Sequence, residues 1–163
     1  MRGSAMTRSE QARLRQLGRL VNIGIVQAGK TKRQEATRAR DLYTGSLFVA
    51  SRRWAETRMD DWVILSAEHG VLDPDAIVSP YCKSLRSLNL RERVAWGKVA
   101  ADSITRRYRG MATLLHCVAS DSFVELLDPF IDRLLLCPVA KLNMGERIRW
   151  FTSECEKGNQ GGI

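Results

Sequence analysis

The sequence predicts a single α/β domain in which helices cover both faces of a mostly parallel sheet. Two observations lead to this fold class. The chain contains four short apolar runs that are continuous rather than alternating, as in strands buried on both faces. Segments with helical spacing or loop composition separate them, in the order β-α-β-loop-α-β-α-β. A length of 163 residues fits one three-layer α/β/α domain. The predicted strands are residues 21–26, 62–66, 113–119 and 133–137.

The first third of the chain is predicted to place a helix on either side of the first strand. Residues 7–19 carry leucines along one side of a short basic helix, and residues 47–58 have the spacing of a second helix. Residues 34–46 are predicted to be irregular, with Gly45 and Ser46 as turn residues.

A long loop is predicted over residues 67–81, after the second strand. A loop of this length in a compact domain is usually functional or disordered, and its apolar residues favour order. Asn89 is then a suitable N-cap for a helix over residues 90–108, because Glu92 stands at the third helical position and completes a capping box.

The C-terminal third is predicted to hold two further helices. Ser120 or Asp121 caps a helix that runs to about residue 130, and residues 145–155 form a last short one. The predicted organisation is a leader and basic helix over residues 1–20, an α/β domain over residues 21–156 and a flexible Gly-rich tail over residues 157–163.

The charge of the chain is unevenly distributed. There are 26 Lys and Arg residues against 18 Asp and Glu, a net charge of +8. Residues 1–60 hold 13 basic and 5 acidic side chains, so the whole excess lies there, since residues 61–163 hold 13 of each. Twenty of the basic residues are Arg, which suits bidentate phosphate contacts. The asymmetry favours an anionic partner, namely a nucleic acid, a nucleotide or a phosphorylated metabolite.

Cysteine usage and hydropathy exclude several classes of protein. The four cysteines are widely separated, with no C-x-x-C pair, which predicts neither a zinc site nor a cofactor. No apolar run approaches the ~18 residues of a membrane span, so no membrane partner is predicted. The N-terminus lacks an apolar signal region, and residues 1–4 are interpreted as a vector-derived leader. A reducing cytoplasm is the predicted compartment.

Ligands of open parallel sheets bind outside the carboxyl ends of the strands, which selects residues 27–33, 66–81 and 119–123. Residues 24–31 match the spacing of a P-loop, but Ile25 and Val26 continue the strand and no helix signal follows. A cationic turn with Gly29 and Lys30 that receives an anion is the alternative, beside simple solvated lysines.

The second of these segments carries His69, directly after a strand. Gly70 allows a sharp turn behind it, and Glu68 or Asp73 is placed to orient the ring. A histidine there can act as general base, proton donor or hydrogen-bonding group to a base, or it can simply hold the loop together. His116 lies inside the third strand and is predicted to be structural.

Asp41 and Tyr43 form a third candidate pair, and Tyr81 joins them from the long loop. The two tyrosines are predicted to stack on a nucleobase, with core packing as an equal alternative.

These segments together resemble a family of small bacterial and phage proteins, largely of unknown function. The family carries C-G-x-x-K, A-x-D-L-Y and I-L-S-A-x-H-G-L-x-x-P motifs. Here the corresponding segments are residues 28–32, 39–43 and 64–74, followed by Pro80-Tyr81, and residues 142–150 match its closing segment. Ala28 replaces the cysteine of the pattern, Val71 replaces the leucine after His-Gly, and Ser120 replaces a glycine.

The family is in turn similar to the uracil-DNA glycosylase-like superfamily, a three-layer fold with a nucleobase pocket. Its relatives include N-glycosidases and enzymes of deazaguanine modification in which a lysine engages the base. The resemblance implies a nucleobase-processing, N-glycosidase-like hydrolase that acts on a nucleic acid or nucleotide. The alternatives are a nucleic-acid-binding module without activity, which Ala28 favours, and a small-molecule nucleotide hydrolase.

The predicted site follows from the motifs and the resemblance together. Lys32 contacts phosphate or attacks C1′, Asp41 or Asp73 activates water or stabilises an oxocarbenium-like state, and His69 donates to the departing base. Arginines of the first third hold phosphates. The substrate-binding set is Gly29, Lys30, Tyr43, Ser66, Gly70, Tyr81 and Ser120, and the nucleic-acid-binding set is Arg33, Arg38, Arg40, Arg52 and Arg53.

Overall fold

The computed structural model describes residues 7–10 and 18–160. Most of the predicted N-terminal helix falls on residues 11–17, which lie outside the described residues. The leader and the last three residues of the predicted tail lie outside them too.

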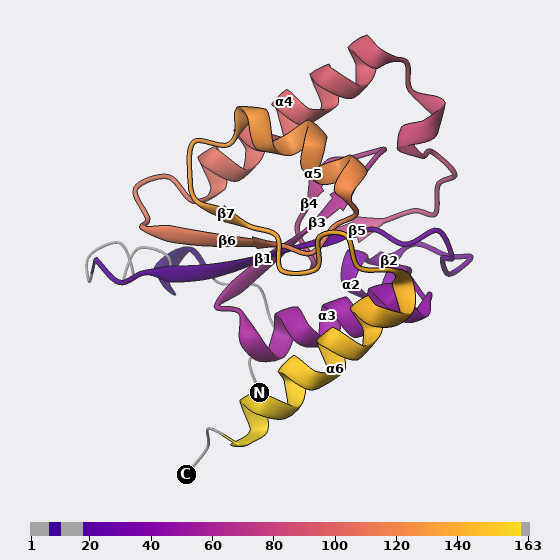
Figure 1. Ribbon diagram of the computed structural model, residues 1–163. Coiled ribbons are helices and arrows are strands. Elements are labelled where there is room, and N and C mark those ends of the chain that lie inside the picture. Colours follow the sequence, from indigo (N-terminus) through magenta and orange to yellow (C-terminus); the bar gives the residue numbers. More distant parts are fainter. Residues whose placement is uncertain (1–6, 11–17, 161–163) are drawn as a thin grey trace.

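Five strands form the central sheet, in the order β4-β3-β1-β6-β7 (Figure 1). β1 pairs in parallel with both β3 and β6, and β6 pairs in parallel with β7. β4 alone runs antiparallel, at the edge beside β3. The prediction of a mostly parallel α/β sheet is confirmed. The strands are β1 (Val21–Gln27), β3 (Asp61–Ser66), β4 (Gly70–Leu72), β6 (Thr113–Cys117) and β7 (Leu135–Leu136).

Helices cover both faces of this sheet. α3 (Ser46–Arg58) packs with α6 (Met144–Gln160) on one face, and α4 (Leu90–Arg107) packs with α5 (Asp121–Leu127) on the other (Figure 1). The central strand β1 contributes side chains to the hydrophobic core on each face of the sheet. Ile25 packs on the α4 face and Val26 on the α3 face. A continuous apolar run is required for this arrangement, because neither face of β1 meets water.

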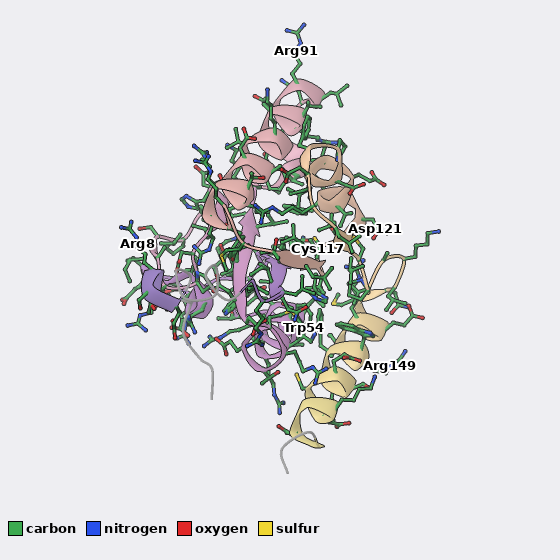
Figure 2. The ribbon with its side chains drawn as sticks, turned by 90° about the vertical axis from the view of Figure 1, so that its left-hand side faces the viewer. Arg8, Trp54, Arg91, Cys117, Asp121 and Arg149 are labelled. Atoms are coloured by element: carbon green, nitrogen blue, oxygen red, sulfur yellow. The ribbon has the colours of Figure 1, made fainter. Side chains whose placement is uncertain are left out.

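The α3 face is filled by aromatic rings. Trp54 of α3, labelled in Figure 2, packs against Trp150 and Phe151 of α6, with ring centroids 5.7 Å and 5.8 Å away. Gly24 of β1 lies beneath it, and a Cβ there would stand 2.9 Å from the side chain of Met59. Gly24 is therefore a packing residue inside a strand, in agreement with the prediction that residues 24–31 are not a P-loop.

The capping box of α4 is confirmed. The Asn89 side chain accepts a hydrogen bond from the Glu92 amide at 3.0 Å, and the Glu92 carboxylate accepts one from the Asn89 amide at 2.8 Å. Two of the orphan amides at the start of the helix are satisfied in this way.

Two segments predicted to lack regular structure contain short elements. Residues 34–46 hold β2 (Thr37–Arg38) and α2 (Ala39–Leu42), and the long loop holds β4 and β5 (Ile77–Val78). β2 pairs antiparallel with β5, so the two segments order each other. Such a pairing across about forty residues has no local signal in the sequence.

The C-terminal elements differ from the prediction in length. α5 ends at Leu127 and continues as the single turn η2 (Asp128–Phe130), and a further turn, η1 (Leu85–Ser87), precedes α4. β7 has two residues rather than five. α6 continues to Gln160, so residues 157–160, predicted as a flexible tail, are helical.

The topology creates a crevice at one edge of the sheet. The chain leaves β1 through α3 to β3 on one side, and reaches β6 through α4 on the other side. The connection through α3 and the connection through α4 therefore lie on opposite sides of the carboxyl end of β1. Open α/β sheets bind ligands at such a position.

Candidate functional site

Two cavities meet at the segment that follows β1, residues 27–30. The first, of about 510 Å³, lies between this segment, the start of α3, residues 118 and 120 after β6, and the start of α6. The second, of about 590 Å³, lies between the same segment, Ala67 and residues 81–86. We call them the α3 cavity and the lysine cavity. Residues 27–30 line both cavities and lie between them.

The lysine cavity is strongly basic. Its lining includes Lys30 and Lys32 from the loop after β1, and Lys83 and Arg86 from the segment before α4. None of the described residues that line it is acidic. Sequence analysis found the first two residues and missed Lys83 and Arg86, because their segment has no motif.

The α3 cavity is more apolar. Leu47, Phe48 and Val118 contribute to its wall. Gln27 and Ser120 supply polar groups, and Lys30 and Arg147 are its two cationic residues. The Gln27 side-chain oxygen accepts a hydrogen bond from the Ser120 amide at 2.7 Å. This bond joins the ends of β1 and β6 and leaves the Gln27 NH₂ group as a donor at the crevice. Gln27 was missed in the sequence, although its place at the end of the first strand was a usable signal.

Lys32 is held by a short antiparallel pairing rather than by a helix. It forms an isolated bridge with Tyr43, flanked by the bonds from Thr44 N to Thr31 O, 3.0 Å, and from Arg33 N to Leu42 O, 2.8 Å. The pairing joins residues 28–32 to residues 39–43, two of the segments that carry the predicted site.

The ammonium group of Lys32 lies over an aromatic surface. Its Nζ is 4.5 Å from the centroid of the Tyr81 ring and 5.8 Å from that of Tyr43, and it donates to the carbonyl of Lys30 at 3.2 Å. Burial lowers the pKa of Lys32 below its usual 10.5, and the negative charge of a Cys82 thiolate partly opposes this shift. The Lys32 ammonium attracts an anion while it is charged, and the lowered pKa means that this charge is lost at a lower pH than in an ordinary lysine.

Three hydroxyl groups form a chain behind Lys32. Tyr43 Oη and Tyr81 Oη lie 2.7 Å apart, and Tyr81 Oη lies 2.6 Å from Ser66 Oγ. Ser66 Oγ also accepts a bond from the His69 amide at 3.2 Å. Two bonds between three hydroxyls use two protons, so the third hydroxyl proton remains for another acceptor at one end of the chain. Burial, and then the bond with Tyr81, raise the pKa of Tyr43 well above its usual value.

His69 stands on the other side of the same tyrosine. Its ring is exposed and meets the Tyr81 ring edge-on, with centroids 5.2 Å apart. Gly70 has a φ of +69°, the left-handed conformation that the sharp turn was predicted to need. The structure thus brings Lys32, Tyr43, Ser66, His69 and Tyr81 into one group, which we call the Tyr81 cluster.

The burial of Tyr43 differs from the prediction for its ring. Tyr43 is 2% exposed and packs against Phe48, with centroids 4.8 Å apart. It belongs to the core, which was the alternative interpretation, and has no open face on which a base could stack. Tyr81 is partly exposed, with Lys32 over its ring.

The two predicted catalytic carboxylates lie in ion pairs outside this cluster. Asp41 accepts from Arg52 at 2.7 Å, and Asp73 accepts from Arg107 at 2.8 Å. Arg107 also pairs at 3.3 Å with Asp61, whose side chain is fully buried. These contacts anchor α2 and the long loop to the helices, which is a structural use of both carboxylates.

The predicted nucleic-acid-binding arginines divide into two groups. Arg40 is 5% exposed and pairs with Glu56 and Asp75, and Arg52 pairs with Asp41 and Glu56. Both guanidinium groups form ion pairs with carboxylates within the fold, and their nucleic-acid-binding role stays a prediction. The exposed members of the set are Arg33, Arg38 and Arg53.

His116 matches its predicted structural role. Its Nε2 lies 3.0 Å from the side-chain oxygen of Asn22 on the neighbouring strand, and burial lowers its pKa. Among the described residues, no group of three or more His, Cys, Asp or Glu is arranged to hold a metal ion. No helix in the described part of the chain has the length and apolar character needed to cross a membrane.

Comparison with known proteins places this arrangement in a family. A model described as "Family of unknown function (DUF6884)" matches residues 23–153. A stretch of 42 residues is 52% identical to the uncharacterized protein YfjM of Bacillus subtilis (strain 168), and it covers 26% of this chain and 28% of that protein. No solved structure matches the chain at a significant level. Because the family model spans most of the chain, this protein belongs to DUF6884, a family of unknown function.

Proposed function

We propose that the protein is a nucleobase-processing enzyme, an N-glycosidase-like hydrolase that acts on a nucleic acid or a nucleotide. The observation that carries the proposal is the Tyr81 cluster, where Lys32 and His69 flank one tyrosine beside a basic cavity at the carboxyl edge of the sheet. The three-layer architecture with its crevice at β1 is compatible with a uracil-DNA glycosylase-like fold, which we include in the proposal.

The proposed reaction breaks the bond between C1′ of the sugar and the base nitrogen, and forms a bond between C1′ and a water oxygen. The base leaves with the electron pair and takes a proton from His69. The water gives its proton to solvent, solvent returns a proton to His69, and Lys32 stays a cation that contacts the phosphate. Asp41 and Asp73 take no part, because their carboxylates are engaged by Arg52 and Arg107.

Base release from a substrate panel tests this proposal. The panel contains nucleoside monophosphates and single- and double-stranded oligonucleotides, and mass spectrometry detects free base. We expect one class to release base, and Lys32→Ala and His69→Ala to lower the rate by roughly 10²-fold or more. Lys98→Ala is the matched control, because Lys98 is exposed on α4. Release at the parental rate by both site variants would show that the site is wrongly assigned.

A nucleic-acid-binding module without activity is the second candidate. Ala28 at the position of the family cysteine and the two engaged carboxylates favour it. It predicts that no member of the panel releases base, while oligonucleotide binding weakens steeply with salt. A slope of log K against log salt near zero would exclude it.

A further inference from the structure

We propose that the lysine cavity is a phosphate subsite, formed by Lys30, Lys32, Lys83 and Arg86, which holds the phosphate of a nucleotide whose base lies beside the Tyr81 cluster. This inference deepens the proposed function and rests on it for the identity of the base-bearing ligand. Lys83 and Arg86 were not among the residues predicted to bind substrate or nucleic acid.

The first support is charge that the protein leaves uncompensated. Many cationic side chains of this molecule pair with carboxylates, as Arg40, Arg52 and Arg107 do. Within the described residues, Lys30, Lys83 and Arg86 form no ion pair, although they line one concave surface with Lys32. Like charges gathered in a cavity repel one another, and a bound anion removes that cost.

The second support is that the charges converge from distant parts of the chain. Lys30 and Lys32 follow β1, whereas Lys83 and Arg86 come about fifty residues later. Tyr81 joins the two segments, because it lies under Lys32 and its hydroxyl is bonded to Tyr43 and Ser66. Tyr81 therefore holds the start of the second basic segment beside the first.

The third support is the position of the lysine cavity beside the Tyr81 cluster. Lys32 and Tyr81 line the cavity, and His69 meets the Tyr81 ring edge-on. A nucleotide whose phosphate lies among the four cations can therefore present its base to His69 beside Tyr81.

Calorimetric titration of the full chain tests the subsite. The probes are the common ribo- and deoxyribonucleoside 5′-monophosphates and the corresponding nucleosides. We expect the parent to bind at least one monophosphate about tenfold or more tightly than its nucleoside. The doubly substituted variant Lys83→Gln/Arg86→Gln should lose this preference while it binds the nucleoside as before. Lys98→Gln/Arg91→Gln removes the same charge from exposed positions of α4 and should keep the preference.

The results separate this inference from the proposed function. Equal affinity of the parent for nucleotide and nucleoside, or a preference that survives Lys83→Gln/Arg86→Gln, overturns the phosphate subsite even if base is released. A phosphate preference without base release on any substrate supports the subsite and contradicts the enzyme.

A further titration with a short single-stranded oligonucleotide distinguishes the two sources of the phosphate. Tighter binding than the monophosphate with a steeper salt dependence identifies a strand phosphate, and weaker binding identifies the free nucleotide. Either result is compatible with the subsite, provided that Lys83→Gln/Arg86→Gln weakens the binding of whichever ligand the parent binds more tightly. If that variant binds both ligands as tightly as the parent does, the subsite is overturned.

Discussion

The Nζ atom of Lys32 lies 4.5 Å above the ring centroid of Tyr81, although 48 residues separate the two in the chain. The contact joins the loop after β1 to the segment before α4. Because the Tyr81 hydroxyl is bonded to both Tyr43 and Ser66, the position of Lys32 is coupled to the end of β3. We regard this relationship as the centre of the site.

The hydroxyl chain makes a prediction about stability. Tyr81→Phe removes two bonds and leaves the buried hydroxyls of Tyr43 and Ser66 with fewer partners, whereas Tyr43→Phe removes one bond. We expect Tyr81→Phe to lower the free energy of unfolding by about 2 kcal/mol and Tyr43→Phe by about 1 kcal/mol. Urea denaturation measures both changes in the free energy of unfolding. Equal changes would contradict the hydrogen-bonded chain of three hydroxyls.

The lowered pKa of Lys32 makes a prediction about pH. Lys32 is charged below its pKa, and this pKa lies below 10.5, so its charge disappears earlier than that of an ordinary lysine as pH rises. Monophosphate affinity should fall over that range. Lys32→Arg should abolish this early fall, because arginine stays charged. Titrations at several pH values from 7 to 10 compare the two proteins, and superimposable profiles would count against the prediction.

The four cysteines should differ in reactivity. Cys82 is exposed in the lysine cavity, Cys137 is partly exposed, and Cys117 and Cys155 are buried. Burial also raises the pKa of Cys117 to about 12, which suppresses its thiolate. A thiol reagent that yields a coloured product should label one residue rapidly in the native protein and all four after denaturation.

Cys82→Ser provides the control for that experiment, since it should abolish the rapid phase. Saturating nucleoside monophosphate should slow the same phase in the parent, because the phosphate occupies the cavity beside Cys82. Rapid labelling of Cys82→Ser would mean that another thiol is the accessible one.

The contact between α4 and α5 makes a prediction about packing. A Cβ at Gly97 would stand 2.0 Å from the backbone oxygen of Leu126, so the two helices approach closely only because Gly97 has no side chain. We expect Gly97→Ala to destabilise the protein by about 1–3 kcal/mol despite the better helix propensity of alanine. Thermal denaturation measures the change.

Gly145→Ala is the matched substitution in α6. A Cβ there meets only the Asn143 side chain at 3.5 Å, an ordinary contact. Its effect should be neutral or slightly stabilising, since alanine is favoured over glycine in helices. If Gly97→Ala and Gly145→Ala change the unfolding temperature equally, the close packing of α4 on α5 is not the cause of the destabilisation.

Local patterns in the sequence predicted most of the fold. The apolar run of β1 is continuous because both of its faces are buried, and the Asn89–Glu92 capping box depends on residues three positions apart. The pairing of β2 with β5 could not be predicted in this way. Each strand has two residues, and only the folded chain brings them together.

The placement of two candidate residues was predictable from their positions along the chain. Lys32 and His69 follow strand ends, and both lie at the carboxyl edge of the sheet. Asp41 and Arg52 illustrate the opposite case, because each satisfies the other across a helix contact that has no sequence signature. Composition alone cannot tell such a pair from free charges.

The structure of the protein bound to a nucleoside monophosphate tests the central claim most directly. The claim is that the lysine cavity holds the phosphate and the adjoining Tyr81 cluster holds the base. We predict the phosphate beside Lys83 and Arg86, and the base beside Tyr81 and His69. A nucleotide bound elsewhere on the molecule, or one with its base among the cations and its phosphate at His69, would contradict the account.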